Sequence, residues 1–298
     1  MSVRQTIKRH FKIISLLQKK PMSFEELQDE IAVDPDSVEE KLLTSQRTFQ
    51  RDILDIASIY GIEIASDKSR YLYHIKEDVE DESTQRLREN FEILNAIRLS
   101  KGMGNSLIFE QRKALGTKHM TGLLYAVQNL WVVEFQYKKF WDGSVSARKV
   151  RPISLKEAKN RWYLIAMDEK DGIIKNFSLD RIEELVLTQT HFKTIPYNVQ
   201  NEFEDSFGII NGTEEDATKV ILSFTPREGR YIESLPLHHS QKLISKDENE
   251  MQFSYFIRPT YDFRMEILSY GDQVKVIAPE NLSQQIKKQF KNGLKHYI

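Results

Sequence analysis

Cysteine is absent from this 298-residue chain. Without thiols the protein can form no disulfide bond, no thiolate metal site and no cysteine nucleophile. Long apolar runs are also missing, so no segment has the length needed to cross a bilayer. The first residues, Met1 to Gln5, lack the apolar core of a secretory signal. We therefore expect a cytoplasmic protein that has no membrane partner.

An excess of one charge is missing too. The 43 basic and 44 acidic residues leave a formal net charge of -1, so any contact with nucleic acid must depend on where the charges lie. Hydrophobic residues make up 40% of the chain and charged residues 29%, a composition that is typical of globular proteins. The length suits two or three domains rather than one.

Catalytic motifs are equally scarce. No glycine-rich phosphate loop follows a predicted strand, and neither an HExxH nor a GxSxG motif is present. The 7 histidines show no metal-ligand spacing, and the adjacent His238 and His239 would point to opposite faces of an extended segment. We therefore predict that the protein is not an enzyme and has no catalytic residue, cofactor or metal site.

The chain begins with an amphipathic segment at residues 3–19, and this pattern predicts a helix. Its predicted buried stripe is Ile7, Phe11, Ile14 and Leu17, and its other faces carry Arg4, Lys8, Arg9 and Lys12. Ser23 and Glu26 have the spacing of a capping box and predict a second helix that runs to about residue 31. A turn at 34–37 and a short helical turn at 38–43 should follow.

The next predicted helix begins after an N-cap at Thr44 or Ser45 and ends at Gly61. Its predicted buried stripe is Phe49, Ile53, Ile56 and Tyr60. Polar side chains on its first turns would then be free to reach base edges and phosphates. Strands at 62–64 and 71–75 would form a hairpin that touches phosphate as a wing. The predicted DNA-binding residues are Ser45, Gln46, Arg47, Thr48, Gln50, Arg51, Lys68 and Arg70.

A second interpretation of this region stays open. Three amphipathic helices and a hairpin can serve as a packing module only, and the acidic residues between Glu25 and Glu40 weaken an argument from electrostatics. The segment from Ser45 to Ile53, however, resembles the recognition helices of winged helix-turn-helix regulators. That resemblance and the order of the elements favour DNA binding.

The middle of the chain changes from helical to strand patterns. An acidic hinge is predicted at 77–82, and helices are predicted at 84–101, 107–115 and 121–128. The predicted strands are 132–137, 145–155, 161–167, 173–179 and 185–190. Five short strands separated by polar turns predict a small curled barrel.

Polar residues stand among the apolar neighbours of these strands. Arginines bind phosphate oxygens through two nitrogens, and aromatic rings stack on bases, so the combination suits a nucleotide-like ligand. Trp162 and Leu164 are predicted to be core residues instead, and Tyr163 has an alternative role as an internally satisfied residue. The predicted ligand-binding residues are Tyr137, Arg148, Arg151, Ser154, Tyr163, Ser178 and Arg181.

The segments Trp162-Tyr163-Leu164 and Phe177-Ser178-Leu179-Asp180-Arg181-Ile182 resemble the signature of the WYL domain of bacterial transcription regulators. Residues 148–155 are similar to the strand that precedes that signature. The resemblance covers essentially the whole chain and implies an Sm-like or SH3-like barrel. Many WYL sequences have a basic residue at the position of Ser178, which leaves Arg148 and Arg181 to hold an anionic ligand here.

The last third predicts a compact α+β unit, with strands at 217–224, 252–257 and 274–278, helices at 230–235 and 262–269, and a final helix from about residue 282. It resembles the extension that often follows WYL domains and serves dimer contacts. We therefore predict an α+β multidomain protein. Its domains are a winged helix-turn-helix (1–76), a helical linker (77–129), a five-stranded barrel (130–191) and an α+β extension (192–298).

The leading hypothesis is a homodimeric transcription regulator whose barrel senses a nucleotide or oligonucleotide-like effector. Two winged helices in a dimer predict a double-stranded operator with an inverted repeat, and phage-defence control is one setting for the family. One alternative is an effector that binds single-stranded nucleic acid through its barrel. Another alternative is a nucleotide-processing enzyme, against which the lack of an acid-base or metal cluster argues.

Overall fold

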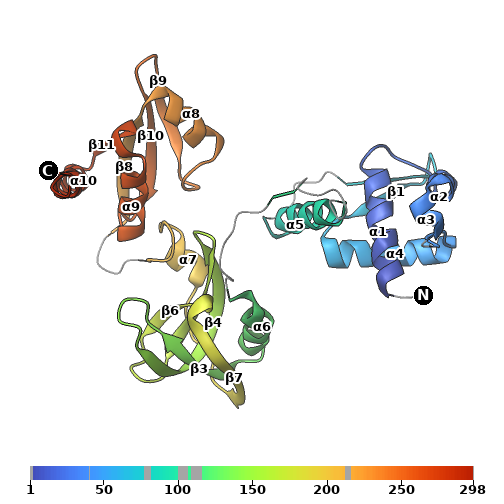
Figure 1. Cartoon of the computed structure of the whole chain (residues 1–298), viewed down its shortest axis with the longest axis horizontal. Helices are drawn as coiled ribbons and strands as arrows, with labels where there is room; N and C mark the ends of the chain where they lie inside the picture. The colour runs from blue at the N-terminus through green and yellow to red at the C-terminus, as the bar shows by residue number, and fades with distance from the viewer. Residues whose placement is uncertain are drawn as a thin grey trace. The chain divides into compact units, whose positions relative to one another are not determined.

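The computed structural model describes residues 3–39, 41–76, 82–99, 107–108, 116–211 and 216–297 (Figure 1). The chain divides into an N-terminal unit, Met1–Gln111, and a C-terminal unit, Arg112–Ile298. Each unit has its own hydrophobic core. The predicted hinge and most of the predicted helix at 107–115 lie outside the described residues. The division into four domains stays a prediction.

The N-terminal unit combines helices with a two-stranded antiparallel hairpin. Its elements are α1 (Val3–Leu17), α2 (Phe24–Val33), α3 (Pro35–Glu39), α4 (Gln46–Tyr60), β1 (Ile64–Asp67), β2 (Leu72–Ile75) and α5 (Glu82–Leu99). The predicted capping box is confirmed, because Ser23 Oγ accepts from the Glu26 N–H and Glu26 Oε2 accepts from the Ser23 N–H. The short helix α3 begins at Pro35 rather than near residue 38, since proline is suited to a first helical position.

The buried face of α1 differs from the predicted stripe. Ile7 is 42% exposed, whereas Arg9 is only 2% exposed. The Arg9 Nε and Nη2 atoms donate to the two carboxylate oxygens of Asp52 on α4, at 2.6 and 2.7 Å. A buried guanidinium is tolerated where a carboxylate accepts from it through two bonds. Helix periodicity could not reveal this pair, because Asp52 lies 43 residues further along the chain.

Helix α4 has the predicted ends. Ser45 Oγ accepts from the Thr48 N–H at 3.3 Å, and Gly61 adopts a left-handed conformation with φ of 66°. Phe49, Ile56 and Tyr60 are buried as predicted. The caps and the buried face together fix which side of α4 meets solvent.

Helix α5 joins the core of the N-terminal unit through Phe91. The Phe91 ring stacks on Phe11 with 4.6 Å between centroids and meets Tyr60 edge-on at 5.3 Å. Leu94, predicted to share the buried stripe, is 56% exposed. The helix is therefore anchored to the core of the N-terminal unit by one aromatic side chain of the predicted stripe, with Ile97 half-buried.

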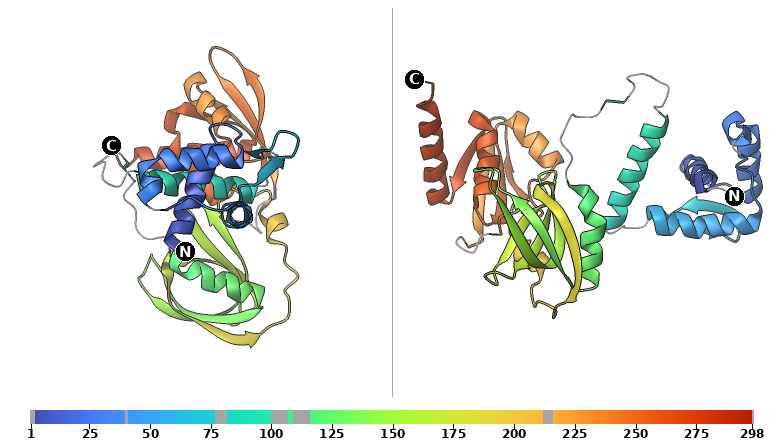
Figure 2. Two further views of the ribbon diagram at one scale, coloured as in Figure 1. Left: turned by 90° about the vertical axis from the view of Figure 1, so that its right-hand side faces the viewer. Right: turned by 60° about the horizontal axis from the view of Figure 1, so that its bottom comes forward.

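The first part of the C-terminal unit is the predicted five-stranded sheet, and Figure 2 shows it curled around a core with α6 alongside. Its elements are a 3-10 turn η1 (Thr117–His119), α6 (Met120–Gln128), β3 (Trp131–Lys138), β4 (Val145–Ala158), β5 (Arg161–Asp168), β6 (Ile174–Ser178), a 3-10 turn η2 (Leu179–Arg181) and β7 (Ile182–His191). The antiparallel strand order is β6-β5-β4-β3-β7. Leu123 and Ala126 of α6 close the core against residues such as Val133, Val150 and Leu164.

The second part is an α+β sandwich. Its elements are α7 (Val199–Phe203), β8 (Thr218–Phe224), α8 (Pro226–Ser234), β9 (Lys242–Lys246), β10 (Met251–Ile257), α9 (Tyr261–Ser269), η3 (Gly271–Gln273), β11 (Val274–Ala278) and α10 (Glu280–Leu294). The sheet order β11-β8-β10-β9 with this connectivity is the split βαβ arrangement. Alternate residues of β8 and β10 are buried, and α8, α9 and α10 pack around this sheet. Helix α8 begins at Pro226, earlier than the predicted residue 230, again with proline at the start.

Side-chain hydrogen bonds join these two parts. Lys159, in the turn between β4 and β5, bonds Glu266 of α9 at 3.0 Å, and Asn176 of β6 donates to the Ile209 carbonyl at 2.8 Å. Within the described ranges, no helix combines the length and the apolar character needed to span a membrane.

Candidate functional site

One face of α4 carries the predicted DNA-binding side chains. Arg47 and Arg51 are exposed and lie one helical turn apart, opposite the buried Phe49 and Ile56. Gln50 is exposed as well, and its amide donates to the Tyr73 hydroxyl at 2.8 Å, which orients it from the hairpin behind. Gln46 is also exposed. Ser45 and Thr48 take part in the N-cap.

The hairpin of the N-terminal unit presents the two predicted wing cations. Lys68 and Arg70 are exposed in the turn between β1 and β2, and the Arg70 side chain is 77% exposed. Asp67 accepts from the backbone and the hydroxyl of Ser69 at 2.9 and 2.6 Å, which fixes the turn. The Arg70 Nε lies 4.0 Å from the same carboxylate, so both cations remain accessible to a phosphate.

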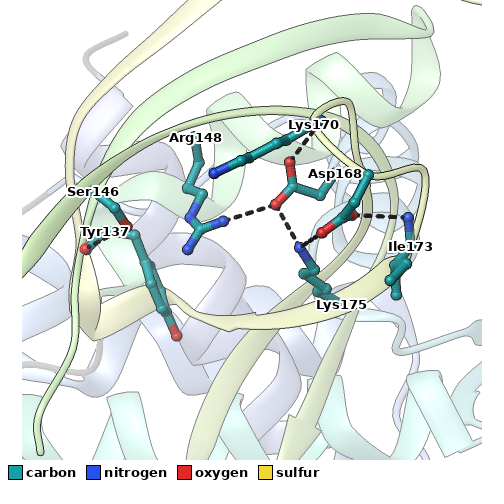
Figure 3. Close-up of polar contacts among 8 residues, drawn as sticks. Tyr137, Ser146, Arg148, Asp168, Lys170, Ile173 and Lys175 are labelled. Atoms are coloured by element: carbon teal, nitrogen blue, oxygen red, sulfur yellow. Dashed lines mark hydrogen bonds and ion pairs between the residues drawn. The ribbon is translucent and has the colours of Figure 1, made fainter.

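In the C-terminal unit, an ion cluster of Arg148, Asp168, Asp171 and Lys175 occupies the end of strands β4, β5 and β6. We call it the Asp168 cluster. Arg148 Nη1 and Lys175 Nζ lie 2.9 and 2.8 Å from the same Asp168 oxygen, and Lys175 also bonds Asp171 at 2.5 Å. Figure 3 shows the Arg148 guanidinium directed at Asp168. Arg148 faces inward because it lies opposite the buried Phe135 in the β3–β4 register.

The carboxyl group of Asp168 is buried and stays ionised. Burial alone would raise its pKa, but bonds from Lys175, the Lys170 N–H and Arg148 outweigh burial, and the pKa lies below 3.8. The two cations are therefore neutralised by carboxylates. Arg148 Nε is buried and has no hydrogen-bond partner among the described residues, so one donor of this guanidinium is unused.

A second cluster, the arginine–aromatic cluster, consists of Tyr137, Phe140, Arg161 and Arg181. The Arg181 guanidinium lies 4.4 Å from the Phe140 centroid and 5.0 Å from the Tyr137 centroid, and Arg161 lies 5.8 Å from Phe140. These are cation–π distances. Arg181 Nε donates to the Lys138 carbonyl at 3.2 Å. In the part of the chain that the structure describes, Arg181 pairs with no carboxylate.

Tyr137 links the two clusters. Burial raises the pKa of its phenol, and the Ser178 N–H, Arg181 and Arg148 act in the opposite direction. The structure thus places Tyr137 directly beside Arg181, whose guanidinium lies 5.0 Å from the Tyr137 ring centroid. Arg148 lies on the neighbouring strand β4, two residues from Ser146, which is the register partner of Tyr137.

The remaining predicted residues lie elsewhere. Ser178 is 2% exposed, and its hydroxyl donates to Asp180. Arg151 faces the other side of β4 from Arg148 and pairs with Glu169 at 3.1 Å. Ser154 lies beyond a bulge in β4, in a shallow depression with residues 196–200. Tyr163 alternates with the buried Leu164, and burial raises the pKa of its phenol.

Two aromatic residues of the β3–β4 loop were missed by the sequence interpretation. Phe140 is 58% exposed and lies beside both arginines, and Trp141, the next residue in the chain, is 83% exposed. Adjacent aromatic residues in a polar loop between predicted strands are unusual on a surface and were a usable signal. The positions of Asp168 and Lys175 at the strand ends carried no comparable signal, since charged residues are common there.

Metal-ligand geometry occurs once among the described residues. Atoms of His10, Asp52 and Asp55 lie within 4.8 Å of one another. The Arg9 guanidinium already takes both carboxylate oxygens of Asp52, so this group is explained as a buried ion pair. His238 and His239 would point apart only in an extended segment, but they lie in a turn, and their ring centroids are 4.1 Å apart. Both nitrogens of His238 have partners, Ser240 and Glu204.

Two family models match segments of the C-terminal unit. Residues 118–187 match the WYL domain family model, and residues 216–294 match the WCX domain family model. No curated protein matches the sequence. Among solved structures, the chain is similar to proteasome accessory factor B/C (PafBC) of Arthrobacter aurescens, with 18% sequence identity, a TM-score of 0.37 and coverage of 95% of this chain and 46% of that chain. It thus spans about half the length of that protein. A CRISPR Cas-related protein is similar over 99% of this chain and 85% of its own, with 8% identity and a TM-score of 0.39.

Proposed function

The chain is a WYL-domain protein in which a WCX domain follows the barrel, and from this premise we propose that it is a ligand-responsive, DNA-binding transcription regulator. The N-terminal unit binds an operator through α4 and the hairpin. The barrel senses an anionic, aromatic ligand such as a nucleotide or a short single strand. The protein regulates transcription and catalyses no reaction.

The observation that carries the DNA-binding proposal is the arginine face of α4. Arg47 and Arg51 project from the first two turns, on the side opposite the core, with Gln50 beside them. Forked guanidinium and amide donors on an exposed helix face suit guanine and adenine edges in a major groove. The exposed Lys68 and Arg70 would contact the flanking phosphates.

The ligand proposal rests on Arg181. Arg148, Arg151 and Arg161 each bond a carboxylate, which lowers their attraction for a bound anion. Arg181 instead lies over two aromatic rings, with Trp141 exposed nearby in the same loop as Phe140. A cation beside accessible rings suits a phosphate joined to a base. We propose Arg181 as the main ligand contact, with Tyr137 and Arg148 as supporting contacts.

Homodimerisation completes the proposal. We infer that the α+β extension provides dimer contacts and that two winged helices bind an inverted repeat. Ligand binding would change operator affinity through the coupling of the two sites, typically by about 1–3 kcal/mol.

The test compares two arginine substitutions on two probes. Arg47→Ala should weaken binding to a duplex selected from a random pool by about 1–3 kcal/mol, and it should leave binding of a ten-nucleotide oligothymidylate unchanged. Arg181→Ala should do the reverse. Arg230→Ala, which removes an exposed arginine of α8, should change neither affinity. Fluorescence anisotropy of the labelled probes measures both.

The opposite pattern would favour a different function. If Arg47→Ala leaves duplex binding intact and Arg181→Ala abolishes all nucleic-acid binding, the barrel is the main binding site and the protein acts on single strands. The exposed Phe140 beside Arg181, followed in the same loop by the exposed Trp141, is the specific observation that favours this second candidate. Loss of both activities in Arg230→Ala would contradict both assignments.

A further inference from the structure

The turn η2 carries Arg181 and is held on several sides. Ser178 and Arg161 both bond the Asp180 carboxylate, and the Ser178 N–H donates to the Tyr137 hydroxyl at 3.2 Å. Leu179 is fully buried in the barrel core. A ligand that moves Arg181 therefore acts on a turn whose other atoms have little freedom to move independently.

The back of η2 lies directly on Gly116. This glycine is buried and adopts φ of +71°, a conformation that side chains other than glycine rarely take. A Cβ at this position would lie 2.2 Å from the Leu179 carbonyl carbon and 2.5 Å from the Asp180 nitrogen. The contact is therefore backbone against backbone, with no flexible side chain between the two segments.

A second contact holds the exit of the turn. His119 Nε2 donates to the Ile182 carbonyl at 3.0 Å, one residue after Arg181. Burial lowers the pKa of His119, and Lys118 lowers it further, so the neutral ring that donates this bond is the form present at neutral pH. Residues 116–119 thus contact both the start and the end of η2.

In the C-terminal unit, residues 116–119 are the first residues that the structure describes. The chain that comes from the DNA-binding unit reaches the barrel through this segment, which we call the entry segment. Directly after it, α6 is fixed by Leu123 and Ala126 in the barrel core.

We propose that the entry segment is the relay between the ligand site and the DNA-binding unit. A ligand bound at Arg181 shifts η2, and η2 shifts the backbone at Gly116 and the His119–Ile182 bond. The shift then passes along the chain from the entry segment toward the DNA-binding unit. Tightly packed backbone atoms transmit such a shift because they cannot absorb it. This inference rests on the proposed ligand site, but the contact itself can be tested without a ligand.

The first experiment perturbs the ligand side and measures the entry segment. Amide hydrogen exchange of the full-length protein is compared for wild type, Arg181→Ala and the matched control Arg151→Ala. The His119 N–H, which donates to the Gly116 carbonyl at 3.0 Å, should exchange about fivefold faster or more in Arg181→Ala. It should not change in Arg151→Ala. An unchanged rate in Arg181→Ala, or an equal increase in both variants, overturns the proposal.

The second experiment measures whether occupation of the ligand site changes duplex binding. The affinity for the selected duplex is measured with and without ten-nucleotide oligothymidylate, for wild type, Gly116→Ala and His119→Ala. The shift seen in wild type should be lost in both variants while each probe alone still binds. If Gly116→Ala does not fold, His119→Ala still tests the proposal. A shift that persists in His119→Ala overturns the relay.

The two proposals fail differently. If the wild type shows no shift with oligothymidylate but Arg181→Ala alone accelerates exchange at His119, the relay stands and the assigned ligand class is wrong. If the wild type shows the shift and exchange at His119 is unaffected by Arg181→Ala, the ligand site stands and the signal takes another route.

Discussion

Asp168 is the residue that holds the Asp168 cluster together. Its carboxylate is 1% exposed and is shared by Arg148 and Lys175. Removing one member of a buried ion pair leaves the other member without compensation, which commonly costs more than the pair itself contributed. The same carboxylate also restrains the direction of Arg148, one of the proposed ligand contacts.

We predict that Asp168→Asn lowers the free energy of unfolding by about 2 kcal/mol, below the usual value for buried pairs because both cations are partly exposed. Urea denaturation at pH 7 measures this. Asp171→Asn, which removes an exposed partner of Lys175, should change stability by less than about 0.5 kcal/mol. Equal effects of both substitutions would contradict the assigned role.

The pH dependence follows from the same group. Because the folded pKa of Asp168 lies below 3.8, its stabilisation is complete above that value and is lost as the pH falls through the lowered pKa. The difference in stability between wild type and Asp168→Asn should therefore shrink in acid and stay constant from pH 5 to 7.

Arg9 and Asp52 form the corresponding pair in the N-terminal unit. Asp52→Ala should cost about 3–5 kcal/mol, because it leaves a buried guanidinium without its carboxylate. The double substitution Arg9→Met and Asp52→Leu should recover most of this loss. Lys12→Ala, which breaks a more exposed pair with Asp34, should cost less than about 1 kcal/mol. Thermal unfolding of the four proteins checks the series.

At the scale of elements, the hairpin β1–β2 gives the clearest prediction. Lys68→Ala should reduce the slope of log affinity for duplex against log salt concentration by about 1, since one phosphate contact is lost. Lys287→Ala, an exposed lysine of α10, should leave the slope unchanged. An unchanged slope in Lys68→Ala would exclude this hairpin as a phosphate contact.

Elements with local signals were predictable from the sequence. Ser45 and Gly61 define the ends of α4 through local interactions. The Ser45 side chain accepts from the Thr48 N–H, and Gly61 adopts the left-handed conformation that ends the helix. The period of two around Leu164 gave β5 and the residues Leu164 and Ala166 that enter the barrel core, although Ile165 on the opposite face is buried as well. The strand β9 was not located at its residues, because all five of its residues are exposed and show no alternation.

The candidate site was only partly predictable, because its contacts are distant in sequence. Arg148 and Arg181 were found as cations in apolar strands, but the partner that neutralises Arg148 lies 20 residues away on β5. Arg9 was assigned to a polar face for the same reason. The role of Gly116 depends on its contact with the Leu179 backbone, and local sequence patterns cannot reveal a contact between residues so far apart in the chain.

For the whole molecule, the proposed dimer makes a prediction about DNA. Footprinting on the selected duplex should reveal two protected half-sites in inverted orientation, separated by about 10 base pairs or a multiple of that spacing. Sedimentation of the free protein should give a species of twice the chain mass at micromolar concentration. Protection of a single half-site by a monomer would contradict the dimeric arrangement.

The three tryptophans of the chain all belong to the barrel: Trp131 and Trp162 are half-buried in it, and Trp141 is exposed in its loop. Indole emission therefore reports on the barrel, because the N-terminal unit contains no tryptophan. Nucleotide stacking on Trp141 would quench the red-shifted component of that emission. A fluorescence titration of the unmodified protein can thus follow ligand binding at the barrel directly.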